Sequence, residues 1–150
     1  MEAKIKLKFI SKSLLVCLIL FTLPAGCASV TAAQYIEQGD KLQKEGRFDE
    51  AVDQYTQAIH HDGNLAEAYH KRAGAYIGQS QFLLAIADST KSIQIDPNAH
   101  QPYQIRGMAY LLLSQYEKST ADLLKVLELT TDPVIIDSVN SILDMPKPTD

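Results

Sequence analysis

The sequence is poor in the residues on which several classes of protein depend. Only two of its 150 residues are cysteine, which excludes a disulfide-stabilised scaffold and a multi-cysteine zinc site. It has 7 glycines and 6 prolines, too few for collagen or a low-complexity array. Runs of alternating β-branched residues, typical of a sheet, are missing too. The remaining composition, 46% hydrophobic and 21% charged, is globular, and the length suits one domain.

Basic residues are scarce beyond the first 26 positions. Four lysines precede Cys27, which leaves 10 of the 14 basic residues and 17 of the 18 acidic residues in the remainder, a net charge of −7. Binding to phosphate groups needs clustered lysine and arginine. We therefore expect no nucleic-acid partner.

The N-terminal segment resembles a bacterial secretory signal peptide. Its lysines are followed by an apolar run of ten residues, Leu14 to Leu23, which is too short to span a membrane. Leu23-Pro24-Ala25-Gly26-Cys27 also resembles a lipobox, in which the cysteine becomes the lipidated first residue of the mature chain. Pro24 departs from that motif, and ordinary cleavage after Ala32 is the alternative. We favour lipidation of Cys27, which implies a lipid anchor in the cell envelope, facing the periplasm and held in the outer membrane. The alternative implies a soluble periplasmic or secreted protein.

The rest of the chain is an internal repeat with a constant period. Residues of the same kind recur at one spacing in three series: Tyr35, Tyr69 and Tyr103; Gly39, Ala73 and Gly107; Phe48, Phe82 and Tyr116. Within each unit the apolar residues follow a helical period in two segments. Gly46, Ser80 and Ser114 separate the two segments and suit tight turns. Small residues at Gly39, Ala51 and Ala58 would let two helix backbones approach closely.

This repeat resembles the tetratricopeptide repeat, a unit of about 34 residues whose pattern is W-x₂-L-G-x₂-Y, then A-x₃-F, then P. Tyrosine takes the tryptophan position in all three units. The leucine position holds Gln38, Arg72 and Arg106, which we expect to be partly exposed. Ser89, Ser92 and Ser119 stand where alanine or larger apolar residues are usual, which predicts looser packing there. The resemblance implies an all-α, right-handed solenoid of three helix-turn-helix repeats.

A further helix is predicted after the third repeat. Asp132 suits a helix N-cap and Pro133 the first turn, and Ile135, Val139, Ile142 and Leu143 form one apolar stripe. Such a helix would cover the end of the stack. The expected organisation is therefore a signal peptide (1–26), a lipidated cysteine with a short tether (27–31), three repeats (32–65, 66–99 and 100–133), a capping helix (134–144) and a tail (145–150).

In the family that the repeat resembles, the first helices line a concave groove for a peptide. The positions that this geometry implies grade from polar to apolar along the stack. They are Ile36, Asp40, Gln43, Lys44, His70, Gly74, Ile77, Gly78, Gln104, Met108 and Leu111. Gly74 and Gly78 are expected to leave room for a partner's backbone. Some members hold a partner's terminal carboxylate with lysine, asparagine and arginine, but the matching positions here, among them Ile36, Asp40 and Gln104, lack those residue types. An alternative for Ile77, Met108 and Leu111 is that they only pack within the fold.

No catalytic motif is present: the sequence contains no P-loop, dinucleotide glycine pattern, G-x-S-x-G or H-E-x-x-H. His61, Asp62 and His70 flank one turn and would be the only candidate metal ligands, although solvated histidines at helix ends are commoner. We expect no enzyme activity, cofactor or metal. The function we predict is a protein-interaction module of the bacterial cell envelope, a lipoprotein scaffold for a protein or peptide partner in pilus, secretion or outer-membrane assembly. The alternatives are an accessory subunit of a cell-envelope enzyme, a small enzyme itself, and a self-associating scaffold.

Overall fold

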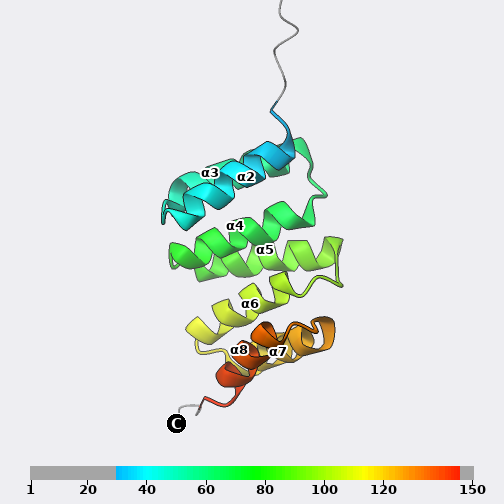
Figure 1. Ribbon diagram of the computed structural model, residues 1–150. Coiled ribbons are helices and arrows are strands. Elements are labelled where there is room, and N and C mark those ends of the chain that lie inside the picture. The colour runs from blue at the N-terminus through cyan, green and yellow to red at the C-terminus, as the bar shows by residue number, and fades with distance from the viewer. Residues whose placement is uncertain (1–29, 146–150) are drawn as a thin grey trace, which may run out of the picture.

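The chain folds into stacked helical hairpins. The computed structural model describes residues 30–145, which hold seven helices and no strand (Figure 1). They are α2 (Ala32–Lys44), α3 (Phe48–His61), α4 (Ala66–Gly78), α5 (Phe82–Ile95), α6 (Gln101–Leu112), α7 (Tyr116–Leu129) and α8 (Pro133–Leu143). The predicted all-α repeat solenoid is confirmed. The predicted signal peptide and Cys27 lie outside the described residues, as do residues 146–150.

The helices form an inner and an outer layer. Within each hairpin the two helices pack against each other along their length. Helix α2 also comes close to α4, and α4 to α6, whereas within residues 30–145 no Cα atom of α5 lies within 8 Å of a Cα atom of α3 or α7. The first helices of successive hairpins therefore lie closer together than the second helices. This difference curves the stack and places α2, α4 and α6 on its inner side. None of the helices in the described stretch is long and apolar enough to cross a membrane.

The turn inside each hairpin uses one residue with a positive φ angle. Gly46 has φ 76°, and Ser80 and Ser114 both have φ 58°. The tight turns predicted at these positions are confirmed. Glycine adopts this conformation freely, but for serine the left-handed region costs about 1–2 kcal/mol. The second and third hairpins therefore carry backbone strain that the first one avoids.

Replacing the strained serines by glycine should stabilise the protein. We expect Ser80→Gly and Ser114→Gly each to raise the free energy of unfolding by about 0.5 kcal/mol, because relief of strain outweighs the extra entropy of the unfolded glycine. Ser138→Gly is the matched control, because Ser138 is exposed within α8. There the same change should lower stability by roughly 0.5 kcal/mol, because glycine is a weaker helix former than serine. Urea unfolding of the three variants measures both signs, and a loss of stability at Ser80 would contradict the strain argument.

The turns between hairpins are fixed by aspartate and tyrosine. The Asp62 carboxylate accepts a hydrogen bond from the Asn64 amide (2.9 Å), and Asp96 accepts one from Asn98 (3.0 Å). The Tyr69 hydroxyl donates to the Gly63 carbonyl, and the Tyr103 hydroxyl donates to Pro97, each at 3.3 Å. Tyrosine at the tryptophan position of the repeat therefore ties the start of each later hairpin to the turn before it.

The helix pairs pack through small residues. Ala51 and Ala58 are completely buried, which confirms the predicted close approach of α2 and α3. Gly39 lies against Tyr55, and a Cβ at Gly39 would stand 2.5 Å from that ring. The out-of-pattern serines are buried as well. Ser92 donates to the Ala66 carbonyl (2.8 Å), and the Ser89 hydroxyl is the one buried side-chain polar atom of residues 30–145 with no hydrogen-bond partner.

The last helix covers the third hairpin. The Asp132 side chain accepts from the Val134 amide, and Pro133 opens α8, as predicted. Val139 is fully buried with Leu123 and Val126 of α7. The rest of the predicted stripe, Ile135, Ile142 and Leu143, packs around this cluster. Helix α8 therefore shields apolar surface of α7 that would otherwise be exposed.

Candidate binding groove

The inner layer carries most of the residues predicted to line a groove. Lys44 and Gly78 are exposed on the surface of α2 and α4. A larger set is partly exposed and comes from all three inner helices: Asp40, Gln43, His70, Gly74, Ile77, Gln104, Met108 and Leu111. The inner face thus presents acidic and amide groups at the first hairpin and aliphatic groups at the third.

Two of the predicted groove residues lie deeper than expected. Ile36 is 7% exposed and belongs to the core cluster formed with Tyr55 and Ala68. Ile77 packs against the buried residues Ala73 and Ala109. The apolar side chain of Ile77 is therefore part of the contact between α4 and its neighbours. A charged substitution at Ile77 would disturb the fold as well as the groove surface.

The two glycines of α4 have a different role from the one predicted. A Cβ at Gly78 would stand 2.5 Å from the ring of Phe48, so the first residue of α3 already fills this space. A Cβ at Gly74 would meet the Gln43 amide nitrogen at 3.4 Å and the Ile105 side chain at 4.0 Å, which is ordinary contact. Gly78 therefore admits a side chain of this chain rather than a partner, and the space beside Gly74 is bounded by Gln43 and Ile105, with room for a methyl group.

These distances predict opposite effects for one substitution. Gly74→Ala should raise the free energy of unfolding by up to about 1 kcal/mol, because alanine favours a helix and meets no clash. Gly78→Ala should lower it, because the Phe48 ring must move. Thermal unfolding of both variants measures the difference. Equal shifts for the two would contradict the placement of Phe48.

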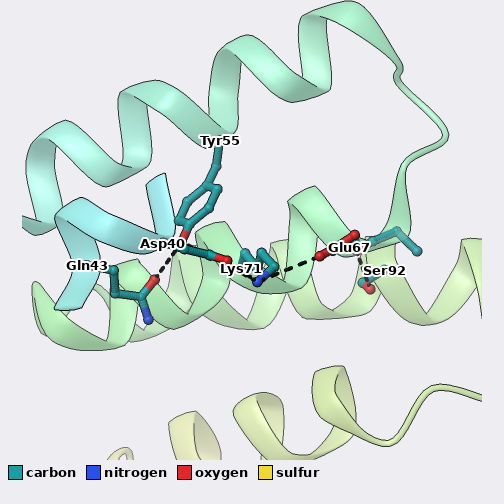
Figure 2. Close-up of polar contacts among 7 residues, drawn as sticks. Asp40, Gln43, Tyr55, Glu67, Lys71 and Ser92 are labelled. Carbon is teal, nitrogen blue, oxygen red and sulfur yellow. Dashed lines mark hydrogen bonds and ion pairs between the residues drawn. The ribbon is translucent and has the colours of Figure 1, made fainter. Parts of the chain in front are cut away.

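A polar cluster joins the first two inner helices (Figure 2). Both carboxylate oxygens of Asp40 in α2 accept hydrogen bonds from the Lys71 ammonium of α4, at 2.7 and 2.9 Å. Asp40 also accepts from the Tyr55 hydroxyl (2.8 Å), which lies 3.1 Å from the Gln43 amide oxygen. Burial, and then the Asp40 carboxylate, raise the pKa of Tyr55, so the phenol stays protonated and donating. Glu67 lies 3.7 Å from Lys71 on its other side.

His70 is neutral on this face. Burial is the main cause that lowers the pKa of His70, and the neighbouring Lys71 ammonium lowers it further. The carboxylates of Glu67 and Asp40 and a backbone hydrogen bond with Ala66 act in the opposite direction but are weaker. The histidine therefore adds no positive charge to the inner face at neutral pH.

The lowered pKa of His70 predicts a loss of stability in mild acid. The unfolded chain takes up the proton at a pKa of about 6.5, while the folded chain resists it. Unfolding therefore becomes easier as the pH falls below about 6.5. In His70→Gln this dependence should be reduced. Urea unfolding of both proteins at pH 7.5 and pH 5.5 measures the change. If the free energy of unfolding falls equally in the two proteins between these pH values, the argument is contradicted.

A second polar network, which was not predicted from the sequence, joins each later inner helix to two outer helices. Arg72 of α4 holds the Asp88 carboxylate of α5 with two bonds of 2.7 and 2.9 Å, and donates to the Thr56 hydroxyl of α3 (3.0 Å). The network recurs one repeat later with Arg106, Asp122 and Thr90. The predicted partial exposure of both arginines is confirmed, but their role is structural. The signal was available, because arginine and aspartate recur together, at the same separation, in the second and third repeats.

The candidate metal ligands do not form a site. Within residues 30–145 no group of three histidine, cysteine, aspartate or glutamate side chains is placed to hold a metal ion. The His61 ring instead lies 5.4 Å from the ring of Tyr35. Asp62 caps its own turn through the Asn64 amide.

Comparison with protein families confirms the second and third of the three predicted repeats. Residues 66–99 and 100–133 each match the family model of the tetratricopeptide repeat. Comparison with curated proteins gave no match.

Solved structures of tetratricopeptide-repeat domains resemble the chain. The first such domain of Spaghetti (RPAP3), bound to the HSP90 peptide SRMEEVD, is 28% identical, with a TM-score of 0.69 over 75% of this chain and 90% of that one. The Arabidopsis OM64 domain is 29% identical, with a TM-score of 0.71 over 75% and 93%. The second domain of human RPAP3, in complex with the HSP70 peptide SGPTIEEVD, is 26% identical, with a TM-score of 0.68 over 76% and 96%.

Proposed function

We propose that this chain of tetratricopeptide repeats binds a peptide segment of a partner protein along α2, α4 and α6. The observation that carries the proposal is the exposure of the inner face along all three of these helices. Partly exposed polar and aliphatic residues line it from Asp40 to Met108, and Gly74 places no side chain at its middle. The two RPAP3 domains named above are bound to peptides, which supports an interaction role for the same fold here.

The chemistry of the groove differs from a site for a terminal carboxylate. The positions that the family resemblance matched to such a site hold Ile36, Asp40, Gly74, Gln104 and Met108. None of these side chains is a cation. Lys71, which lies beside Asp40, is already paired with that carboxylate. An acidic peptide tail would meet carboxylates here, so we propose a partner of another kind.

Site-specific photo-crosslinking tests the role of the inner face. A photoreactive amino acid at Gln104 or Met108 should crosslink one protein partner in the native host. The same group at Lys91, which is exposed on the outer helix α5, is the control and should not crosslink that partner. Crosslinks to the same protein from Lys91 alone would contradict binding by the inner face.

We further propose that the chain is a lipoprotein of the bacterial cell envelope, anchored through Cys27 on the periplasmic side of the outer membrane, where its partner belongs to pilus, secretion or outer-membrane assembly. The start of α2 supports cleavage before Cys27 over cleavage after Ala32. The Thr31 side chain accepts from the Gln34 amide, and the Gln34 side chain accepts from the Thr31 amide, which forms a capping box. Cleavage after Ala32 would remove this cap, at a cost of about 1 kcal/mol.

Membrane fractionation tests the anchor. The wild-type protein should enter the membrane fraction and be released by detergent, while Cys27→Ser should stay in the periplasmic fraction. Ala28→Ser is a control that leaves the cysteine in place. Wild-type protein that is soluble in the periplasm would contradict lipidation.

Self-association is a second candidate, carried by one apolar patch. Leu83 is 72% exposed at the start of α5, Leu84 is exposed beside it, and both line one shallow hollow with Leu113. Light scattering of the wild type and of Leu83→Gln/Leu84→Gln tests this candidate. A dimer that the double variant abolishes would support it, and a monomeric wild type would exclude it.

A further inference from the structure

A hollow opens on the inner face between the first and second hairpins. It has a volume of about 480 Å³, within the range of sites that bind small ligands or single side chains. Helix α2, the turn before α4 and the first turn of α4 surround it. Its apolar wall includes Ile36 and Leu65, which belong to or pack against the core of the first hairpin. It continues the proposed groove at its polar end, because Asp40 belongs to both.

The rim of the hollow is acidic. Glu37, Asp40, Asp62 and Glu67 all line it. In the part of the chain that the structure describes, Lys71 is the one cation in an ion pair with these carboxylates: it is held by Asp40 at 2.7 Å and lies 3.7 Å from Glu67. Within residues 30–145, Glu37 and Asp62 form no ion pair. Four carboxylates therefore face one ammonium group, and the hollow keeps a negative charge.

An apolar wall below a carboxylate rim matches a lysine or arginine side chain. The methylene groups of these residues bury against apolar surface while their charged ends stay at the polar edge. A small cation such as a metal ion would gain nothing from Ile36 and Leu65, and an acidic side chain would be repelled by the rim. The ligand chemistry that fits both parts is a cation on an aliphatic stem.

We infer that the hollow between α2 and α4 takes a lysine or arginine of the partner, and that the groove prefers a basic segment with aliphatic neighbours. This inference rests on the proposed function, since it names the partner class of the same groove. The aliphatic neighbours would lie toward Gly74 and Met108. The preference is opposite in charge to the peptides in the RPAP3 complexes, SRMEEVD and SGPTIEEVD, whose last four residues include three acidic ones.

Selection from a random dodecapeptide library displayed on phage tests the inference with the purified protein. The selected peptides should be enriched in lysine or arginine next to aliphatic residues. Synthetic copies should bind in calorimetry and should compete with one another for one site. Binding should weaken as the salt concentration rises, because exposed charges are screened.

Two double variants distinguish binding by the carboxylates of the rim from attraction by the overall negative charge of the protein. Glu37→Gln/Asp62→Asn removes the two carboxylates without ion pairs and should weaken binding of the selected peptides at least tenfold. Glu117→Gln/Asp137→Asn makes the same chemical change on exposed positions of α7 and α8 and should leave binding within twofold. Circular dichroism should show equal helicity for both.

The outcomes distinguish the inference from the proposed function. The basic preference would be overturned if peptides without basic residues bind the inner face, or if both double variants weaken the binding of basic peptides equally. Either outcome would leave the proposed peptide binding intact. If no selected peptide is sensitive to a change on the inner face, tested with Gln104→Ala and Gly74→Ala, both the inference and the proposed function fail.

Discussion

Arg72→Met should destabilise the protein strongly, lowering the free energy of unfolding by about 3 kcal/mol. The Arg72 and Asp88 side chains are only 17% and 12% exposed, and the guanidinium makes both of its carboxylate bonds below 3 Å. Removing the arginine leaves the Asp88 carboxylate among α3, α4 and α5 without its cation. It also leaves the Thr56 hydroxyl without its donor. Urea unfolding measures the loss.

The double variant Arg72→Met/Asp88→Leu should recover much of this stability. Replacing both members of a buried ion pair with apolar residues is often neutral, because the cost of desolvating two charges disappears with the pair. Arg47→Met is the control, because Arg47 is an exposed arginine that also binds carboxylates, Glu45 and Glu50, and we expect a change below about 1 kcal/mol there. A single variant as stable as the wild type would show that the network contributes nothing.

Gly39→Leu should cost about 3 kcal/mol or more through overpacking. The ring of Tyr55 already stands 2.5 Å from the position of a Cβ at Gly39. That ring cannot change its rotamer freely, because it is fully buried and its hydroxyl is hydrogen-bonded to Asp40 and Gln43. Thermal unfolding measures the effect. Gly63→Leu is the control, since a Cβ at Gly63 meets only a backbone oxygen at 4.0 Å.

The repeats themselves suggest a compensating change. Gly39 faces Tyr55 in the first hairpin and Gly107 faces Leu123 in the third, whereas the equivalent positions of the second hold Ala73 and Ser89. A large residue on the outer helix thus goes with glycine on the inner helix. Gly39→Ala should therefore be less harmful when combined with Tyr55→Ser than in the wild-type background. Additive losses in this double-mutant cycle would contradict the pairing.

Much of the fold could be predicted because the relevant signals are local or periodic. The constant spacing of Phe48, Phe82 and Tyr116 marks the first residues of α3, α5 and α7. The turn residue Gly46 and the N-cap Asp132 act through their own backbone neighbourhood, so their chemistry can be read without knowing the tertiary structure. For the same reason the start and end of each hairpin were predictable.

The groove was less predictable because its details depend on contacts between hairpins. Spacing places Gly78 on the inner face, but only the position of Phe48 shows that the space beside it is filled. Ile77 is on an inner helix and still packs against the buried cluster that includes Ala109 of the next hairpin. Asp40 and Lys71 do not recur one repeat later, where the equivalent positions hold Gly74 and Ile105, so their ion pair had no periodic signal. A residue pair that recurs in successive repeats can be inferred from the sequence, whereas a pair that occurs once needs the structure.

A nuclear magnetic resonance titration with a peptide from the crosslinked partner tests the central claim, that the inner layer is the binding surface. Backbone amide shifts should change at Asp40, Gly74, Gln104 and Met108, on three successive inner helices. Gly74→Ala should keep the fold and reduce the affinity, because it adds a methyl group at a partly exposed position of the inner face. Shifts confined to Leu83 and Leu84, or to the outer faces of α3, α5 and α7, would contradict the account.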